Sequence, residues 1–264
     1  MLSFYKPKNS FLAKYIEGYY FLKSDNIDFS FSYYTFPNNF QIVTCALDSE
    51  VRIEKDHLIS NYKKDGEFIS TITCNYSKPI KIEYHGKVNE VTVYFKPLGL
   101  NYFIKDINRF YKKKNFSAFI PENDFQKQLE VVLTKNTLEE SIECLEMYWL
   151  SQFQRINIEK VELILTLLNE MSVQEVSEKM GISRQYLHKI FKLYLGKTPS
   201  GYKRIQRFRN TVDFPKSDLT QLGLQNMYYD QSHFIKDVLH FTNTLPKIFF
   251  KTIQFKTTNP WLII

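Results

Sequence analysis

The stretch SVQEVSEKMGISRQYLHKIFKLYLGKTP, residues 172–199, decides how the C-terminal part of the chain folds. Ser172 is followed three residues later by Glu175, a capping box that predicts the start of a short helix. Gly181 interrupts that helix, and Ser183 is a good N-cap for a second one. The second helix has an apolar face, made by Leu187, Ile190 and Phe191. The sequence therefore predicts a short helix, a tight turn and a second helix, and the outward side of the second helix is rich in hydrogen-bond donors.

The same pattern is repeated further along the chain. The matching pairs are Val173 and Leu219, Val176 and Leu222, Leu187 and Phe234, Phe191 and Val238, and the segments GKTP at 196–199 and NTLP at 243–246. The offset is 46 residues before the turn and 47 after it, so the second turn is one residue longer. One such stretch is a weak signal, but two in tandem are specific for helix-turn-helix motifs. We therefore predict an all-α domain over residues 157–264, with motifs at 172–196 and 218–243.

Residues 157–252 resemble the DNA-binding domain of AraC/XylS-type transcription regulators. The stretches VSEKMGISRQYLHKIFKLYLGKTPSGYKRIQRFR and DLTQLGLQNMYYDQSHFIKDVLHFTNTLPKIF carry the resemblance. It implies two helix-turn-helix subdomains joined by a linker helix, which bind two successive major-groove segments of double-stranded DNA. The second motif departs from the family pattern, because Gly223, Met227 and Val238 stand where Ala, Gly and Phe are usual, and Asn243–Pro246 replaces Gly-x-Thr-Pro.

The polar side of each predicted recognition helix supplies the candidates for base contact. They are Arg184, Gln185, His188 and Lys189 in the first helix, and Gln231, Ser232, His233 and Lys236 in the second. A helix fits the major groove, where Gln can pair with adenine and Lys can donate to guanine. The candidates for phosphate contact are Ser183, Lys197, Thr198 and Lys247, with the helix N-termini near Ser183 and Asp230.

Each of these residues has a plainer interpretation as a solvated side chain on a helix surface. Asp230 could cap its own helix and contact nothing else. Arg204, Arg207 and Arg209 lie in the predicted linker helix, where a structural pair with a carboxylate and a phosphate contact both stay open.

Charge is unevenly distributed along the chain. Residues 1–158 hold 20 Lys and Arg against 19 Asp and Glu, and residues 159–264 hold 15 against 9. The net charge of +7 therefore lies almost entirely in the C-terminal part. A basic domain favours an anionic partner, of which a phosphate backbone is the commonest.

The N-terminal part has a different pattern. Residues 1–97 contain short runs of alternating aromatic and β-branched residues, such as EVTVYF at 90–95, separated by turn residues. This predicts an antiparallel barrel or sandwich. After it we expect a helix over 98–110, a helix opened by Pro121, and a long helix over 137–153 that starts with a capping box at Thr137 and Glu140. The long helix could pack on the core or form a dimer seam. The chain is thus predicted to be α+β, with an N-terminal domain over 1–153.

In the resembling family the N-terminal domain is often a cupin-like barrel that binds a small molecule, and nearby helices mediate dimerisation. The weaker resemblance over residues 4–110 implies a ligand-sensing or dimerisation domain here. The many aromatic residues could line an apolar ligand pocket or simply fill the core. His57 and His85 form no HxH pair, so we expect no metal site and no cofactor.

Other classes of protein are disfavoured by the sequence. It contains no GxSxG, P-loop, GxGxxG or HExxH motif, so we expect no enzymatic activity. The start of the chain contains Lys, Asn and Glu in the region that a signal peptide keeps apolar. No run of about 18 apolar residues exists, so we expect no membrane span. The three cysteines are widely spaced and so form no disulfide framework. We expect a cytoplasmic, bacterial protein without membrane contact.

The sequence thus predicts a transcription regulator that binds double-stranded DNA. Its further partners would be a small-molecule effector, a second copy in a homodimer and RNA polymerase. We expect an activator, although the sequence itself contains no feature that distinguishes activation from repression. The alternative is a ligand-binding or protein-interaction module whose DNA-binding half has decayed, which the substituted second motif favours.

Overall fold

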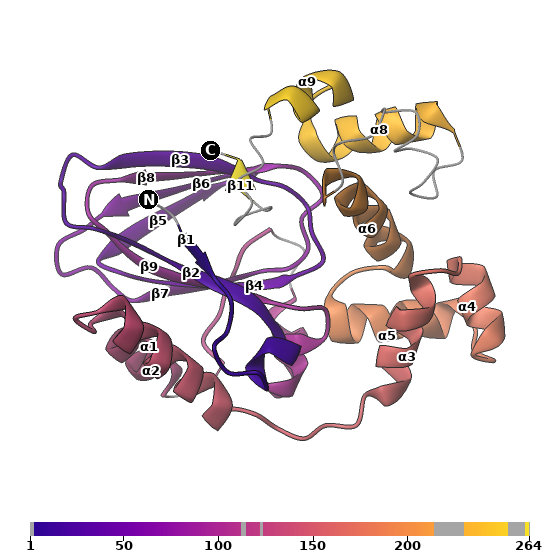
Figure 1. The fold of residues 1–264 in the computed structure, drawn as a ribbon, viewed down its shortest axis with the longest axis horizontal. Helices are drawn as coiled ribbons and strands as arrows, with labels where there is room; N and C mark the ends of the chain where they lie inside the picture. The colour runs from indigo at the N-terminus through magenta and orange to yellow at the C-terminus, as the bar shows by residue number, and fades with distance from the viewer. Residues whose placement is uncertain (1–2, 112–114, 122–123, 214–229, 253–261, 264) are drawn as a thin grey trace. The chain divides into compact units, whose positions relative to one another are not determined.

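The computed structural model describes residues 3–111, 115–121, 124–213, 230–252 and 262–263. The chain forms two compact units (Figure 1). We call the first the β-unit; it contains Met1–Tyr33, Phe40–Asn75 and Lys81–Ile156. We call the second the helical unit; it contains Tyr34–Asn39, Tyr76–Ile80 and Asn157–Ile264. Two short segments from the first third of the sequence therefore belong with the C-terminal helices.

The strands form two sheets, with the orders β1-β2-β9-β4-β7-β10 and β11-β3-β8-β6-β5. The strands are β1 (Ser3–Tyr5), β2 (Ile16–Ser24), β3 (Ser30–Thr35), β4 (Gln41–Leu47), β5 (Ser49–Glu54), β6 (His57–Tyr62), β7 (Ile69–Thr73), β8 (Ile80–His85), β9 (Val88–Phe95), β10 (Ser117–Ala118) and β11 (Leu262–Ile263). The predicted β-rich sandwich or barrel is confirmed as these two sheets, but the expectation that it is antiparallel throughout is wrong, because β6 and β8 run in the same direction where they pair.

Strand β9 is the centre of the six-stranded sheet, where it pairs antiparallel with both β2 and β4. Its residues Val91, Val93 and Phe95 are almost fully buried, as the alternation predicted. The neighbouring Tyr94 is buried as well, because the second face of this strand is also covered. The turn before β9 needs Gly86, whose φ of +83° lies in the region that residues with a side chain rarely adopt.

The segment after β9 differs from the expected helix over 98–110. It contains two short 3₁₀ segments, η2 (Gly99–Tyr102) and η3 (Ile107–Phe110), in addition to η1 (Leu12–Lys14) earlier in the chain. The prediction of one helix is wrong because Leu98 and Asp106 both adopt left-handed backbone conformations, with φ of 68° and 52°. A left-handed residue ends the regular hydrogen-bond ladder of a helix.

Two helices complete the β-unit: α1 (Phe125–Leu133) and α2 (Leu138–Ser151). α1 begins at Phe125 and so does not include Pro121. α2 has the predicted capping box between Thr137 and Glu140. Trp149 of α2 is buried against Phe95 of β9, with 4.8 Å between the ring centroids. α2 therefore packs on the core, while its Met147 is 63% exposed.

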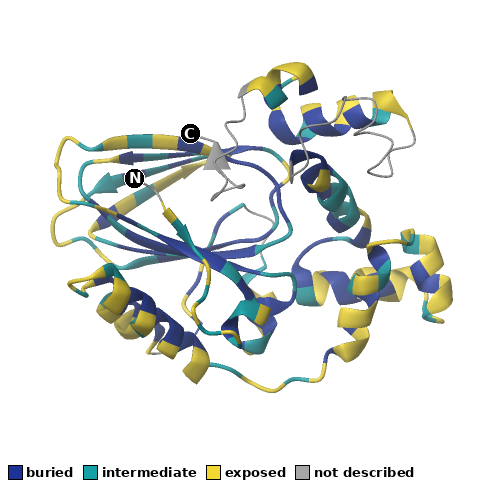
Figure 2. Ribbon diagram, viewed as in Figure 1, coloured by how far each residue is buried: buried dark blue, intermediate teal, exposed yellow. Residues whose placement is uncertain are grey.

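The helical unit contains α3 (Glu159–Leu168), α4 (Val173–Lys179), α5 (Arg184–Leu195), α6 (Pro199–Asp213), α8 (Gln231–Thr242) and α9 (Pro246–Thr252). Each of these helices has a buried face, and the opposite face is largely exposed except on α6, where it is mostly half-buried (Figure 2). The core between α6, α8 and α9 contains Phe208, Phe234, Val238, Phe241 and Phe249. Of the helices that the structure describes, none is long and apolar enough to cross a membrane.

Candidate nucleic-acid interface and interior cavity

The first helix-turn-helix has the local structure that its sequence predicts. Ser172 and Glu175 form both hydrogen bonds of the capping box at the start of α4. Gly181 takes the left-handed conformation of the turn, with φ of +61°. Ser183 caps α5, because its side-chain oxygen accepts a hydrogen bond from the Tyr186 backbone at 3.1 Å. At the other end Gly196 ends α5 with φ of +69°.

The orientation of α5 is set by its apolar face. Leu187 and Phe191 are completely buried, and Ile190 is nearly so. The opposite face carries all four residues that we predict to contact bases in this motif, Arg184, Gln185, His188 and Lys189, and each of them is exposed. The structure therefore brings these donors together on one open helix face, which is the arrangement that reading base edges requires.

The four predicted phosphate contacts have different surroundings. Ser183 is exposed at the N-terminus of α5, and Lys247 is exposed on α9. Thr198 accepts a hydrogen bond from the Gly201 backbone at 3.0 Å, so its oxygen already serves the start of α6.

Lys197 lies in a position that does not suit a phosphate contact. It is only 4% exposed, and its Nζ donates a hydrogen bond to the backbone carbonyl of Asn38 within the helical unit. A phosphate could reach Lys197 only after this contact is broken. The sequence alone suggested an accessible lysine because it gives no sign that residues 34–39 belong to the helical unit.

The second recognition helix, α8, is described from its N-cap onward. Asp230 caps it by accepting a hydrogen bond from the His233 backbone at 2.7 Å, which was the plainer interpretation of this residue. Gln231, Ser232 and Lys236 are exposed, and His233 is partly exposed. The first helix predicted for this motif, within residues 218–229, lies outside the described residues.

A buried carboxylate holds α8 against the linker helix α6. Asp237 is 1% exposed, and its Oδ1 accepts a hydrogen bond from Arg204 Nε at 2.6 Å. Its Oδ2 lies 3.9 Å from Arg207 and 3.8 Å from Nε2 of His233. For Arg204, the pair with a carboxylate is therefore the role that the structure supports. The His233 ring, predicted to contact a base, lies close to this buried carboxylate.

The sequence contained a signal for this network that our prediction did not use. Phe234, Val238 and Phe241 mark the apolar face of α8, and Asp237 lies on that same face. An acid on a core face needs a buried partner, because burying an unpaired charge is costly. The arginines of the linker helix were the nearest candidates.

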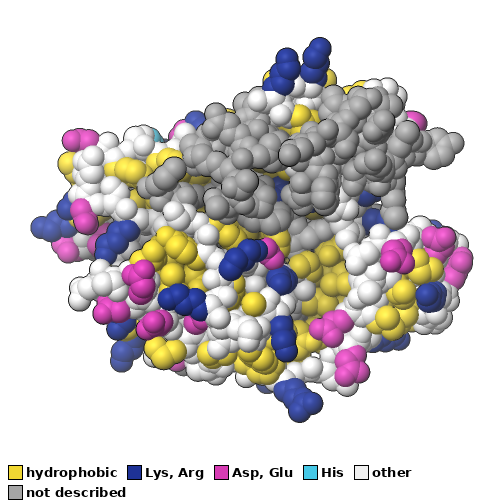
Figure 3. Space-filling view, viewed as in Figure 1, with side chains coloured by type: hydrophobic (Ala, Val, Ile, Leu, Met, Phe, Trp, Pro, Cys, Tyr) yellow, Lys and Arg dark blue, Asp and Glu magenta, His cyan; other side chains and the backbone are white. Residues whose placement is uncertain are grey.

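Positive charge is concentrated on α5 and α6. Residues 183–213 contain eight Lys and Arg against one Asp, whereas residues 157–182 contain two Lys against five Glu. In Figure 3 acidic side chains gather over α3 and α4, and basic side chains project from the region of α9. The basic character of the C-terminal part therefore coincides with the first recognition helix and the linker helix, as electrostatic attraction of DNA requires.

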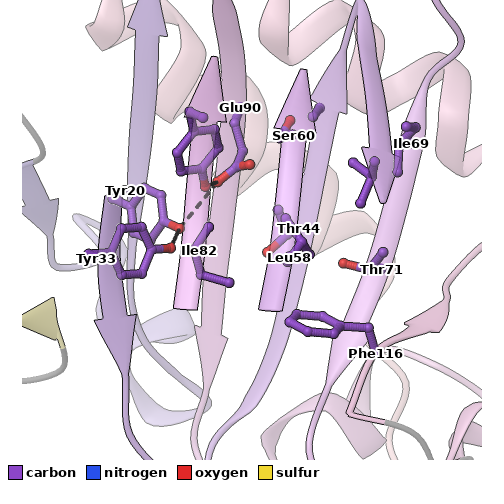
Figure 4. Close-up of a pocket in the computed structure, with 13 residues that line it drawn as sticks. Tyr20, Tyr33, Thr44, Leu58, Ser60, Ile69, Thr71, Ile82, Glu90 and Phe116 are labelled. Carbon is purple, nitrogen blue, oxygen red and sulfur yellow. Dashed lines mark hydrogen bonds between the residues drawn. The ribbon is translucent and has the colours of Figure 1, made fainter. Parts of the chain in front are cut away.

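The β-unit contains an interior cavity of about 40 Å³ between the two sheets. Figure 4 shows Tyr20 and Tyr33 side by side, close to Glu90, with Ser60 and Phe116 further along the cavity. Glu90 of β9 is 4% exposed. Its Oε1 accepts hydrogen bonds from Tyr84 at 2.8 Å, and from Tyr20 and Thr92 at 3.2 Å each.

Burial raises the pKa of the Glu90 carboxyl to about 7, although the three hydrogen bonds act in the opposite direction. The sequence did not single out Glu90, because a glutamate at the start of an alternating strand pattern normally marks an exposed position. The only available signal was its place between Val88 and the run VTVYF at 91–95.

These features define a class of structural motif, a helix-turn-helix with an exposed second helix. Residues 167–202, which span α4, α5 and the start of α6, match the family model described as bacterial regulatory helix-turn-helix proteins, AraC family. The chain thus carries an AraC-type helix-turn-helix, and the resemblance seen in the sequence is confirmed over these residues. No curated protein matches the chain.

Solved structures of ToxT from Vibrio cholerae are similar to the chain in fold. One, at 1.65 Å resolution, has 13% sequence identity and a TM-score of 0.43, and the match covers 88% of this chain and 98% of that one. Another, of an apo ToxT variant in which one lysine is replaced by alanine, has 12% identity and a TM-score of 0.41, with coverage of 89% and 98%.

Proposed function

We propose that this chain is a sequence-specific regulator of transcription that binds two successive major-groove segments of double-stranded DNA through α5 and α8. The observation that carries the proposal is the open face of α5, where Arg184, Gln185, His188 and Lys189 are all exposed on a helix fixed by buried Leu187 and Phe191. Side chains of these types form the usual hydrogen bonds to base edges.

The second recognition helix supports the same proposal in a weaker form. α8 presents Gln231, Ser232 and Lys236 on its exposed face, next to the cap at Asp230. Gln and Lys have the same chemistry toward adenine and guanine here as in α5. Ser183 and Lys247 are the accessible candidates for phosphate contacts, which fix the register of the protein on the duplex.

The β-unit is the proposed sensor. Its interior cavity contains polar groups from both sheets, which is the arrangement of a small-molecule site. A homodimer and contact with RNA polymerase belong to the same proposal, as does a cytoplasmic location, where bacterial DNA is found. We assign no enzymatic reaction, metal or cofactor.

The test is selection of binding sites from a random duplex library with the full chain, at two salt concentrations. His188→Ala and His233→Ala would be compared with His85→Ala, which makes the same chemical change at an exposed position of β8. We expect two half-sites about one helical turn apart, as for paired recognition helices. Each substitution should relax only its own half-site, and His85→Ala should change neither.

The alternative function is a ligand-binding or protein-interaction module whose DNA-binding half has decayed. The substitutions in the second motif, such as Met227 where the family has Gly, favour it. This alternative predicts no enriched sequence and no dependence of binding on salt, whereas a regulator that contacts phosphates loses affinity steeply as salt rises. Enrichment of the first half-site alone would mean that α8 contacts only the backbone.

A further inference from the structure

We propose that the interior cavity of the β-unit binds a small organic cation, such as an alkylammonium ion, between the Glu90 carboxylate and the surrounding tyrosine rings. This inference rests on the proposed function, since it names the chemical class of the effector that the regulator would sense. Both sheets contribute to the site: Tyr20 and Glu90 come from one sheet, and Tyr33, Ser60 and Tyr84 come from the other.

The charge of the cavity selects a cation. Of the described residues that line it, Glu90 is the only acidic one and none is basic. A buried charge is normally paired with an opposite charge or bound to a cation. A positively charged ligand would therefore provide the counter-charge that the lining residues do not supply.

The hydrogen bonds of Glu90 leave room for that ligand. Among the described residues, all three donors to this carboxyl, Tyr20, Tyr84 and Thr92, are bonded to Oε1. Figure 4 shows one carboxyl oxygen directed toward the tyrosine hydroxyls and the other directed away from them. The second oxygen, Oε2, is therefore the one available to accept a hydrogen bond from an ammonium group.

The aromatic groups around Glu90 favour an organic cation over a neutral ligand. Tyr33 and Tyr84 pack against one another with 6.3 Å between their ring centroids and 28° between their planes, and the hydroxyl of Tyr20 lies 3.0 Å from that of Tyr33. Cations are attracted to the faces of such rings, and the attraction is strongest where water is excluded. Aromatic side chains around a cation are a usual feature of ammonium recognition, and the Glu90 carboxylate would add the opposite charge.

The size of the cavity limits the ligand. Its volume of about 40 Å³ is roughly three times what one water molecule needs, about 10–15 Å³. A ligand of a few heavy atoms fits without movement of the sheets. A sugar or a long acyl chain does not fit this space.

Protonation of Glu90 is coupled to such binding. A nearby cation favours the charged form of the Glu90 carboxyl. A cationic ligand that binds near pH 7 should therefore release, on average, a fraction of one proton from Glu90 for each ligand bound. The other titratable groups that face Glu90 are Tyr20, Tyr33, Tyr84 and Cys45. Burial raises the pKa of Tyr20, Tyr84 and Cys45, so these groups stay neutral through this range. Binding should therefore strengthen as the pH rises from 6 to 8.

The experiment is a calorimetric titration of the full chain, without DNA, with methylammonium chloride. Methanol, which has the same number of heavy atoms and no charge, is the neutral comparison. Each titration would be repeated in two buffers that differ in ionisation enthalpy, which reports the protons released. We expect methylammonium to bind with proton release, and methanol to bind roughly tenfold more weakly or not at all.

Two variants complete the test. Glu90→Gln should weaken methylammonium binding roughly tenfold or more and abolish the proton release. Glu54→Gln makes the same change at an exposed position of β5 and should have no effect. Because proton release is measured on the natural chain, the proposal stays testable even where Glu90→Gln fails to fold.

Two results would overturn the proposal: equal binding of methanol and methylammonium, or no binding of methylammonium at pH 8. Neither result bears on the DNA-binding function, which the library selection tests in the absence of any amine. Conversely, methylammonium binding with no enriched DNA site would leave the cation site standing and refute the regulator.

Discussion

The contact between Asp237 and Arg204 should control how firmly the second recognition helix is held. Asp237 of α8 is buried, with a side chain 2% exposed, and Arg204 of α6 donates to it at 2.6 Å. Arg204 also lies over the ring of Phe241, at 5.0 Å from its centroid. The contact of Asp237 with Arg207 of α6 is longer, at 3.9 Å. Loss of the contact with Arg204 should therefore loosen α8 on the linker helix.

The magnitude follows from the burial of the two partners. Removing one member of a buried ion pair typically costs about 3–5 kcal/mol, because the other charge remains buried. Here the side chain of Arg204 is 37% exposed and that of Asp237 is 2% exposed. Because Arg204 can still reach water, we expect Asp237→Asn to cost near the lower end, about 3 kcal/mol. We expect Arg204→Met to cost about the same, since it leaves the buried carboxylate with only the longer contacts to Arg207 and His233.

The assay is a double-mutant cycle. Urea unfolding of the natural chain, both single variants and the double variant would be followed by hydrogen exchange, read on peptides from α6 and α8. The double variant should be destabilised by about 1.5 kcal/mol less than the sum of the single variants, because its two effects share one contact. The cycle also cancels the loss of the ring contact with Phe241. Lys236→Met, on the exposed face of α8, is the control and should stay within about 0.5 kcal/mol of the natural chain.

Additive effects, within about 0.5 kcal/mol, would refute this account, since they would mean that the two side chains do not stabilise one another in solution. In that case the short contact would not be what holds α8 in place.

Three further predictions concern single positions. The pKa of Glu90 in the folded chain is about 7, above the usual 4.5, so protonated Glu90 stabilises the folded state below pH 4.5 and this stabilisation is lost as the pH rises through 7. Urea unfolding of the β-unit should therefore show a loss of about 3 kcal/mol in the free energy of unfolding across this window. The loss should be absent in Glu90→Gln. Lys247→Ala should reduce the slope of log affinity against log salt by about 1, because Lys247 is the exposed lysine that we expect to contact a phosphate. Lys197→Ala should leave the slope unchanged, because Lys197 is buried. Equal slopes for the two variants would contradict this distinction. Gly181→Ala should destabilise the helical unit by about 1 kcal/mol through its φ of +61° alone, because an added Cβ would meet no atom within 4 Å; a measured loss several times larger would contradict this.

Features that depend on local sequence could be predicted. The capping boxes at Ser172 and Thr137 and the caps at Ser183 and Asp230 all form as their residue types indicate. Each depends on residues within three positions of one another, so no knowledge of the rest of the fold is needed. The exposed face of α5 follows in the same way from the spacing of Leu187, Ile190 and Phe191.

Features that depend on contacts between distant segments of the chain could not be predicted from the sequence. Lys197 seemed accessible from its place after Gly196, but it is buried by a segment about 160 positions earlier in the chain, where it donates to Asn38. The helix expected over 98–110 had suitable apolar spacing, yet left-handed conformations at Leu98 and Asp106 divide it. These conformations depend on how the segment packs, which periodicity does not encode.

The two buried carboxylates show why buried polar side chains were harder to predict than the fold. Asp237 lies on a face that Phe234, Val238 and Phe241 mark as apolar, whereas Glu90 lies on the face of β9 that carries Thr92 and Tyr94, which the structure buries as well. Their surroundings then separate them. Asp237 has arginine partners from another helix, so its charge stabilises the packing of α8 on α6. Glu90 has only tyrosine and threonine hydroxyls among its described partners, and it faces a cavity. A buried acid whose counter-charge is supplied by the protein is structural; one that lacks a counter-charge beside a cavity is suited to a ligand that supplies it.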